Sequence, residues 1–331
     1  MLADLSRESI MQRIYKAIAV IAALWSGAAA AQSYPTHPIT MIVPFAAGGP
    51  TDIIARIVGE NMSKTLGQQI VIENVVGAGG TTGITRGAKA NPDGYTIMMG
   101  HMGTHGAAPA LYPKLQYDPT KDFAPIGIAA GTPILIVAKK TMAAGNLQEF
   151  IAFLKANQDK LNQAHAGIGS VSQTTCAMFN SMIGVKPTFV GYSGTGPALN
   201  DLVGGQVDYA CDQIVNLVEQ IKAGTIKAYA IATPARSPSL PDVPTTTEAG
   251  LPQYQVSAWN AVFAPKNTPP AVVQRLSDAL IKALDDAATR KRLLDLGGVI
   301  PEGDERTPAY LGEFVKKEVA RWTPILQTEA K

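Results

Sequence analysis

The stretch VPFAAGGPTDIIARIVGENM, residues 43–62, joins an apolar run to a bend rich in glycine and alanine and then to a helix. Apolar side chains recur at helical spacing through residues 51–66, and Gly67 ends the pattern. The first turn of such a helix presents unpaired N–H groups and a partial positive charge. The segment therefore predicts an anion-binding loop that needs no basic side chain.

The same order of strand, glycine loop and helix recurs in the second half of the chain. HAGIGS at 165–170 precedes a predicted helix at 171–183, and GYSGTG at 191–196 precedes Pro197. A glycine before a helix is often only turn chemistry, so each loop alone is weak evidence. The repetition favours an anion held between glycine loops that face one cleft.

Short apolar runs alternate with amphipathic stretches after residue 34, which is typical of an α/β protein with doubly wound sheets. A chain of 331 residues is long enough for two lobes of roughly 100 to 150 residues each. The terminal helices have no strand series of their own and must pack on the first lobe. We therefore expect a discontinuous domain 1, residues 34–135 and 255–331, and an inserted domain 2, residues 136–254, with a cleft between them.

The N-terminus predicts export. Arg13 and Lys16 precede an apolar run and a small-residue tail that ends at Ala31, which are the three regions of a signal peptide. A membrane anchor is the alternative, but the run is shorter than the ~20 residues that a spanning helix needs. We expect a signal peptide at 1–31, cleaved near Ala31. Whether the first methionine or Met11 is the initiator stays open.

Composition excludes some classes of protein. Apolar residues make up 46% and charged residues 16% of the chain, which is typical of globular proteins. The net charge of +2 is spread along the sequence, so we expect no nucleic-acid partner. The two cysteines, Cys176 and Cys211, fit either a disulfide or two buried thiols, and the sequence leaves both open.

Motifs for nucleotide binding and acyl transfer are incomplete. The chain has no phosphate loop with its lysine, and the dinucleotide pattern fails at Thr82 and at Ser172. The nucleophile elbow fails at Thr195, where the pattern needs glycine. We therefore expect a protein that is not an enzyme and that uses no cofactor.

Polar residues next to the predicted loops are candidates for binding a ligand. His101 and His105 are four residues apart, but the glycines between and around them indicate a loop, so a metal site is disfavoured. His101 and Thr104 are instead candidate donors to a carboxylate. Asp52 and the similarly placed Asp212 fit either helix capping or contact with a ligand, with capping favoured for Asp52.

Longer segments identify a family resemblance. The chain is similar to the periplasmic solute-binding proteins of tripartite tricarboxylate transporters, the Bordetella uptake-type (Bug) receptors, over essentially the whole mature sequence. The segments that carry the similarity are VPFAAGGPTDIIAR, VIENVVGAGGTTG, NPDGYT, ALYPKLQYDPTKDFAPIG, HAGIGS, YSGTGPALNDLVGGQVDYACDQ and SPSLPDVPTTTEAGLP.

The resemblance implies a two-domain Venus-flytrap fold of the periplasmic binding proteins, similar to type II. It also implies capture of a small carboxylate in the periplasm, delivery to a membrane permease, and no metal. We expect a monomer. Adding the neighbouring polar and aromatic residues, the expected ligand-binding set is Phe45, Ala46, Ala47, Gly48, Gly49, Thr51, Asp52, His101, Thr104, Gly167, Ile168, Gly169, Ser170, Tyr192, Gly194 and Asp212.

Two departures from the family pattern leave the ligand open. Many members have Asn where this chain has Gln213, and Ser or Thr where it has His101. His101 favours a second carboxylate, so we expect a dicarboxylate, a tricarboxylate or an aromatic carboxylate. The alternative functions are a ligand-dependent partner of a membrane sensor kinase and a small-acid hydrolase or isomerase.

Overall fold

The computed structural model of the protein describes residues 34–329, and the signal peptide predicted at 1–31 lies outside the described residues. From Pro38 onward the described chain makes up one contact unit. Across residues 34–329, no helix combines the length and the apolar character that crossing a membrane requires.

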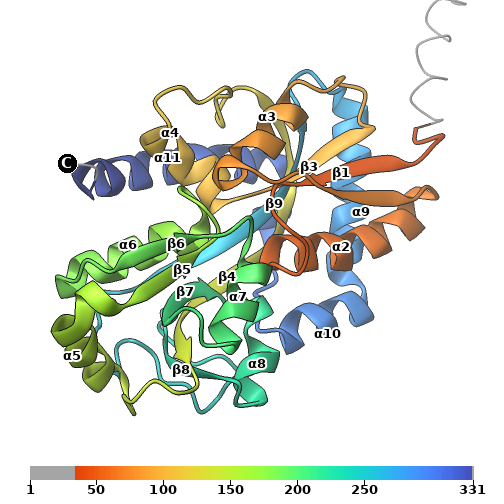
Figure 1. Cartoon of the computed structure of the whole chain (residues 1–331). Helices are drawn as coiled ribbons and strands as arrows, with labels where there is room; N and C mark the ends of the chain where they lie inside the picture. Colours follow the sequence, from red (N-terminus) through yellow and green to blue (C-terminus); the bar gives the residue numbers. More distant parts are fainter. Residues whose placement is uncertain (1–33, 330–331) are drawn as a thin grey trace, which may run out of the picture. The chain divides into compact units, whose positions relative to one another are not determined.

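Nine strands form one sheet whose two halves are built differently (Figure 1). In the first half, β1 (Ile39–Val43) lies between the parallel strands β2 (Ile70–Asn74) and β3 (Thr96–His101). The antiparallel strand β9 (Ser257–Pro265) then pairs with β3 on one side and with β4 (Phe123–Lys139) on the other. This half brings strands from both ends of the chain together.

The second half of the sheet uses the other end of β4. Its residues 134–139 pair antiparallel with β7 (Tyr209–Gln213) and with β8 (Ile226–Ile231). The strand β5 (Asn162–His165) is parallel to β6 (Thr188–Gly191) and to β7. We call the elements around β1, β2, β3 and β9 the first lobe and those around β5 to β8 the second lobe.

The strand β4 runs through both lobes. The sequence shows two apolar runs, Phe123 to Ala129 and Pro133 to Ala138, but in the structure they form a single strand of 17 residues with irregular register near Gly127 and Ala130. The predicted boundary between residues 135 and 136 therefore falls inside a strand. A strand that is shared by two lobes can bend there without breaking its pairing in either.

Helices cover each half of the sheet. In the first lobe α2 packs on α9, and α11 packs on β4 and on the turn after β3; in the second lobe α6 packs on β7. The helices of the first lobe are α2 (Pro50–Leu66), α3 (Thr81–Ala88), α4 (Ala108–Leu111), α9 (Pro270–Asp285), α10 (Ala287–Asp295) and α11 (Pro308–Glu329). Those of the second are α5 (Leu147–Asn157), α6 (Val171–Ile183), α7 (Thr195–Val203) and α8 (Val218–Lys222).

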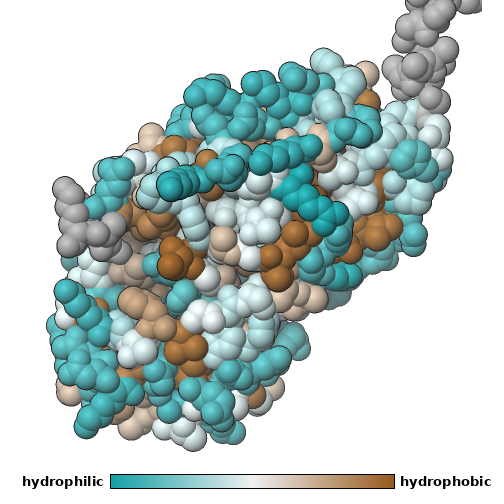
Figure 2. Space-filling view, turned by 45° about the horizontal axis from the view of Figure 1, so that its top comes forward, coloured by the Kyte–Doolittle hydropathy of each residue, from teal (hydrophilic) through white to brown (hydrophobic). Residues whose placement is uncertain are grey.

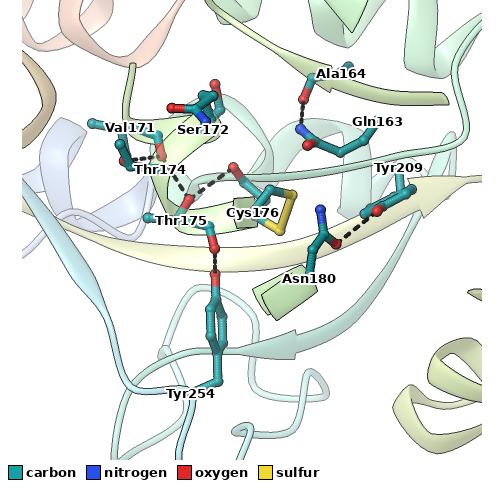
Figure 3. Close-up of a disulfide and its surroundings, with 12 residues drawn as sticks. Gln163, Ala164, Val171, Ser172, Thr174, Thr175, Cys176, Asn180, Tyr209 and Tyr254 are labelled. Atoms are coloured by element: carbon teal, nitrogen blue, oxygen red, sulfur yellow. Dashed lines mark hydrogen bonds between the residues drawn. A yellow bond between two sulfur atoms is a disulfide. The ribbon is translucent and has the colours of Figure 1, made fainter. Parts of the chain in front are cut away.

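A disulfide joins α6 to β7 in the core of the second lobe. Cys176 and Cys211 are both fully buried, and their Cα atoms lie 5.1 Å apart (Figure 3). Beside the bridge, the Thr175 carbonyl accepts a hydrogen bond from the Tyr254 hydroxyl at 3.0 Å. The structure thus decides between the two states that the sequence left open for these cysteines.

Two elements end later than the sequence predicts. The strand β7 includes Asp212 and Gln213, which were expected just after it, and β3 includes Gly100 and His101. The residues Met102–Ala107 then form a turn of π-helix rather than a loop. The side chains of Asp212 and His101 are therefore held by strands, and a strand positions a side chain more precisely than a loop.

Hydrophobic residues on the surface are scattered. On the face drawn in Figure 2 they form small separate patches among hydrophilic residues. The exposed large hydrophobic residues of the described chain include Ile168 and Phe189, on loops and strands of the second lobe, and Leu294 and Val299 near the end of α10.

Candidate functional site

The loop after β1 approaches the second lobe through its backbone. Gly49 is the N-cap of α2 without a capping side chain, and Pro50 occupies the first turn. Gly48 has φ of +82°, a conformation that glycine adopts without strain. The amide of Ala46 donates a hydrogen bond to the Ser193 carbonyl in the second lobe at 3.1 Å. The predicted first and third glycine loops are therefore in direct contact.

A second contact between lobes joins the loop around Ile168 to two segments of the first lobe, Tyr112 after α4 and Gly79 after β2. The Tyr112 hydroxyl donates a hydrogen bond to the Ile168 carbonyl at 2.6 Å. A Cβ added to Gly79 would lie 1.7 Å from that same carbonyl oxygen, and one added to Gly103 would lie 2.4 Å from the Gly169 oxygen. Only glycine allows backbones to approach this closely. The described conformation is thus one in which the glycine loops of the two lobes touch.

An inner cavity lies between these loops and leaves about 10 Å³ for the centres of water molecules. That is about the smallest space that holds one water. The predicted site residues among its lining are Phe45, Gly49, Thr51, His101, Ser170 and Asp212, and the unpredicted ones are Pro50, Ala166, Val171, Ser172, Thr195 and Gln213.

An outer cavity of about 310 Å³ shares Phe45 and Ala166 with the inner one. Its predicted members are Phe45, Gly167, Ile168 and Tyr192, and the Tyr192 hydroxyl donates to Asp201 at 2.7 Å. Its lining also includes Gly77, Ala78, Gly79, Gly80, Tyr112 and Ser193. The loop VGAGGTTG has the same strand, glycine and helix order as the other three, and that signal could have placed it at the site.

The remaining predicted site residues belong to the same loops but line neither cavity. They are Ala46, Ala47, Gly48, Asp52, Thr104, Gly169 and Gly194. Several of them form the contact between lobes, since a Cβ on Gly194 would lie 2.9 Å from the Ala46 nitrogen. The predicted residues thus come from the loops around the two cavities, while individual members of each loop differ in what they face.

Asp52 holds the first loop together. Its carboxylate accepts hydrogen bonds from the Gly48 amide at 3.0 Å, from Arg56 at 2.9 Å and from the Asn74 amide at 3.0 Å. Burial by itself raises the pKa of Asp52, but these hydrogen bonds, led by that of Arg56, outweigh burial and leave the pKa below its ordinary value. The geometry favours the capping interpretation of Asp52 over ligand contact.

His101 ends β3 and caps the π-helical turn that follows. Its Nδ1 accepts hydrogen bonds from the amides of Gly103 at 2.8 Å and Thr104 at 3.2 Å, and its ring stacks on Phe45 with 4.9 Å between centroids. Burial lowers the pKa of His101 to about 4, so the ring is neutral at pH 7. A neutral ring that accepts at Nδ1 carries its proton on Nε2. His101 is therefore a hydrogen-bond donor without charge.

Thr104 has a local role that differs from the predicted one. Its Oγ1 accepts a hydrogen bond from the His101 amide at 3.1 Å and contacts the His105 Nδ1 at 3.0 Å. The hydroxyl is fully buried and lines neither cavity. The expectation that Thr104 donates to a ligand is not supported by this geometry, because the π-helical turn directs its hydroxyl back to the end of β3.

A buried polar network connects the lobes beneath the inner cavity. The Thr51 hydroxyl donates to the side-chain Oδ1 of Asn260 at 3.0 Å, and the side-chain Nδ2 of Asn260 donates to the Gln213 Oε1 at 2.9 Å. The Thr132 hydroxyl also donates to the Gln213 Oε1 at 2.7 Å. Both of these donors bind the side-chain oxygen of Gln213. The side-chain nitrogen, Nε2, can therefore donate a hydrogen bond to a ligand in the inner cavity, which Gln213 lines.

Asp212 is the one acidic residue lining the inner cavity. Its Oδ2 accepts a hydrogen bond from Asn216 at 3.2 Å, whereas its Oδ1 has no partner among the residues that the structure describes. Burial raises the pKa of Asp212 to about 7, although nearby polar groups, among them the Asn216 amide that donates to Oδ2, partly counteract it.

In the described part of the chain, no lysine or arginine lines the inner or the outer cavity. Within residues 34–329, the structure also has no group of three or more His, Cys, Asp or Glu side chains that could hold a metal ion. The arrangement at the meeting of the lobes consists of backbone N–H groups, hydroxyls, an amide, a neutral imidazole and one carboxyl group. Such groups can bind an anion by hydrogen bonds rather than by a charge pair.

A family model described as the tripartite tricarboxylate transporter family receptor matches residues 54–330. The chain belongs to this family. It is a family of solute-binding receptors, and the resemblance seen in the sequence, including that to the Bug proteins, is confirmed.

Solved structures support the same conclusion. MatC from Rhodopseudomonas palustris, solved with bound malate, is 50% identical, with a TM-score of 0.86 over 88% of this chain and 100% of that one. The periplasmic binding protein BugD is 41% identical, with a TM-score of 0.87 over 90% and 99%. A second R. palustris protein, solved with adipate, is 31% identical, with a TM-score of 0.85 over 90% and 98%.

These similarities confirm the predicted two-lobe α/β fold of the periplasmic binding proteins. They also agree with the predicted chemistry of the ligand at a coarse level, because two of these similar proteins were solved with a dicarboxylate, malate or adipate.

Proposed function

We propose that this receptor captures a small aliphatic dicarboxylate of the malate type between its lobes and delivers it to a tripartite tricarboxylate-type permease. The observation that carries the proposal is the inner cavity, where glycine loops of both lobes meet around uncharged hydrogen-bond donors. A carboxylate held by several N–H and O–H donors needs no cation.

The ligand class is supported by the similarity to MatC, whose solved structure contains malate, and by the more distant adipate-bound protein. An aromatic carboxylate is less favoured, because one face of the Phe45 ring is already covered by His101. We therefore favour the dicarboxylate among the ligand classes that the sequence left open.

Ligand entry on this proposal requires the lobes to separate. A dicarboxylate exceeds the space for about one water that the inner cavity leaves. We propose that residues 34–135 with 255–331 and residues 136–254 move as two domains, with β4 and β9 near the crossing points. Closure around the bound ligand then brings the glycine loops of the two lobes back toward each other.

The location is part of the same proposal. The signal peptide at 1–31 would direct the chain to the periplasm, and the similarity to the periplasmic binding protein BugD supports this location. There the receptor would act as a monomer without enzymatic activity and meet the permease in the closed, liganded form.

The test is a titration of the purified mature protein with malate, succinate, fumarate, citrate, adipate and benzoate. We expect saturable heat and a concentration-dependent rise in Tm with a C4 dicarboxylate, since a ligand that binds only the native state stabilises it. A control titration with the corresponding monoamide removes one charge. No binding of any of these dicarboxylates at millimolar concentration would overturn the proposal.

A further inference from the structure

One oxygen of the Asp212 carboxyl group, Oδ1, is an acceptor without a donor, whereas Oδ2 accepts a hydrogen bond from Asn216. The Asp212 side chain lines the inner cavity and is 3% exposed, and its Oδ1 has no hydrogen-bond partner in the described part of the chain. A buried carboxylate oxygen without a donor costs free energy, so proteins rarely retain one without a function. A group that pairs with Asp212 Oδ1 must donate a hydrogen bond to it.

The other polar groups around the cavity have the opposite character. His101 donates from Nε2, Gln213 from its amide nitrogen, and Ser170, Ser172 and Thr195 carry hydroxyls. These donors suit the carboxylates of a ligand. Asp212 repels an ionised carboxylate, whereas an alcohol hydroxyl would donate to it.

We infer that the Asp212 carboxylate accepts a hydrogen bond from a hydroxyl group of the ligand, so that the site selects hydroxylated dicarboxylates over unsubstituted ones. The inference rests on the proposed function and names the substrate class of that same site. Malate and succinate differ only by such a hydroxyl, and they are therefore the pair of ligands that tests it. A site with a buried acceptor discriminates strongly against an analogue that leaves the acceptor unpaired.

The selectivity depends on pH. The pKa of Asp212 is raised to about 7, so the group is protonated below that pH and can itself donate to a carboxylate. Above it, the ionised form requires the ligand hydroxyl. We therefore expect succinate affinity to fall as pH rises through 7 and malate affinity to change less.

The other described side chains that line the same cavities as Asp212 do not titrate in that range. Besides the inner cavity, Asp212 lines a third cavity, which also leaves about 10 Å³ and lies against Ser172 of α6, Thr195 of α7 and Leu217 after β7. The inner cavity is bordered in addition by α2 through Thr51 and by β3 through His101. Of the side chains that line these two cavities, His101 is the only other titratable one, and its pKa of about 4 keeps it neutral from pH 5.5 upward.

The experiment measures Kd of malate and succinate by calorimetry at about pH 5.5 and about pH 8.5. For the natural protein we expect malate to bind at least about tenfold more tightly at the higher pH, and the ratio to shrink several-fold at the lower pH. In Asp212→Asn the ratio should fall below about threefold at both values, and succinate should bind more tightly than to the natural protein at the higher pH.

The matched control is Asp208→Asn. Asp208 lies next to the start of β7 and pairs with Lys139 at 2.6 Å, outside both cavities, so the malate-to-succinate ratio should stay unchanged. Fluorosuccinate is a second probe that needs no variant. It resembles malate in size but cannot donate a proton, so we expect it to bind like succinate.

Equal affinities of the natural protein for malate and succinate at pH 8.5 would overturn the inference, as would an unchanged ratio in Asp212→Asn. Tight binding of fluorosuccinate, equal to that of malate, would also overturn it. Failure of the natural protein to bind either acid would instead reject the proposed function, so the two failures are distinguishable.

Discussion

His101 combines two tasks in one side chain. Its Nδ1 caps the turn after β3, and its ring lines the inner cavity against Phe45. Nδ1 accepts the capping hydrogen bonds, and burial keeps the ring neutral. The proton is therefore on Nε2, which acts as a donor. A histidine provides both functions because its two nitrogens differ in the neutral ring.

The variant His101→Asn separates these tasks. Asparagine is among the preferred N-cap residues, so the free energy of unfolding should change by no more than about 1 kcal/mol. The shorter side chain cannot replace the Nε2 donor, and we expect the ligand Kd to rise by about tenfold. Chemical denaturation and calorimetry measure the two effects.

His101→Ala is the companion to that variant, because it removes the cap as well as the donor. We expect it to lose stability in addition to affinity. If His101→Asn binds the ligand as tightly as the natural protein does, then His101 is a capping residue and does not contact the ligand.

A disulfide joins the elements α6 and β7. The bridge between Cys176 and Cys211 closes a loop with a sequence separation of 35 residues, and both ends lie in regular structure (Figure 3). The closed loop contains the glycine segment at 191–196 and the start of β7, up to the residue before Asp212. The disulfide thus connects the helix capped by Ser170 to the strand that carries Asp212.

Removing the bridge should destabilise the protein. In the chain-entropy description, a loop of this length is worth about 3 to 4 kcal/mol of unfolding free energy. We expect Cys176→Ala/Cys211→Ala to lower the midpoint of denaturation accordingly. Each single variant already breaks the bridge, so the double variant should lose little more than either one. Losses that add would show that packing of the two sulfurs, and not the crosslink, stabilises this region.

At the scale of the whole molecule, closure rests on backbone contacts between glycine loops. Gly79 faces the Ile168 carbonyl, and the Tyr112 hydroxyl bonds to the same oxygen. The polar network from Thr51 through Asn260 to Gln213 joins the lobes deeper in the fold. Side chains at the glycine positions would hold the lobes apart.

Gly79→Ala tests this directly. Its methyl group would lie 1.7 Å from the Ile168 oxygen in the closed form, so we expect the ligand Kd to rise by more than tenfold. Gly67→Ala is the matched control, because Gly67 also has a positive φ, of +73°, but has no atom within 4 Å of an added Cβ. Both variants should pay a similar backbone strain of about 1 to 2 kcal/mol.

Calorimetry on the two glycine variants distinguishes clash from strain. If Gly67→Ala weakens the ligand as much as Gly79→Ala does, then strain in the fold is the cause. If neither variant changes the Kd, the described contact between Gly79 and Ile168 is not part of the ligand-bound state.

Much of the fold could be predicted because local patterns carried it. Glycine after an apolar strand, and Pro50 or Pro197 just inside a helix, mark strand–loop–helix units whatever the rest of the chain does. These marks located the loops around the cavities. They could not distinguish Gly49, which lines the inner cavity, from Gly48, which does not, because that depends on the direction of each backbone group.

Periodicity predicted the element types but not their ends. The strand β7 extends to Gln213 because β4 offers hydrogen-bond partners there, with Ile134 opposite Gln213 and Leu135 opposite Asp212. This pairing joins residues far apart in the sequence, so the residues next to Asp212 and Gln213 do not predict where β7 ends. The same reason explains why Thr132 and Asn260, which are 128 residues apart, were not associated with the site.

The order of residues along the chain was enough to predict an α/β receptor with glycine loops at strand ends, because turn chemistry and helix capping act between near neighbours. The three-dimensional packing decided that Asp212 Oδ1 has no donor in the described structure and that His101 carries its proton on Nε2. It also brought Cys176 and Cys211 together. Those outcomes depend on groups brought together from distant positions, where burial changes the energy of every polar atom.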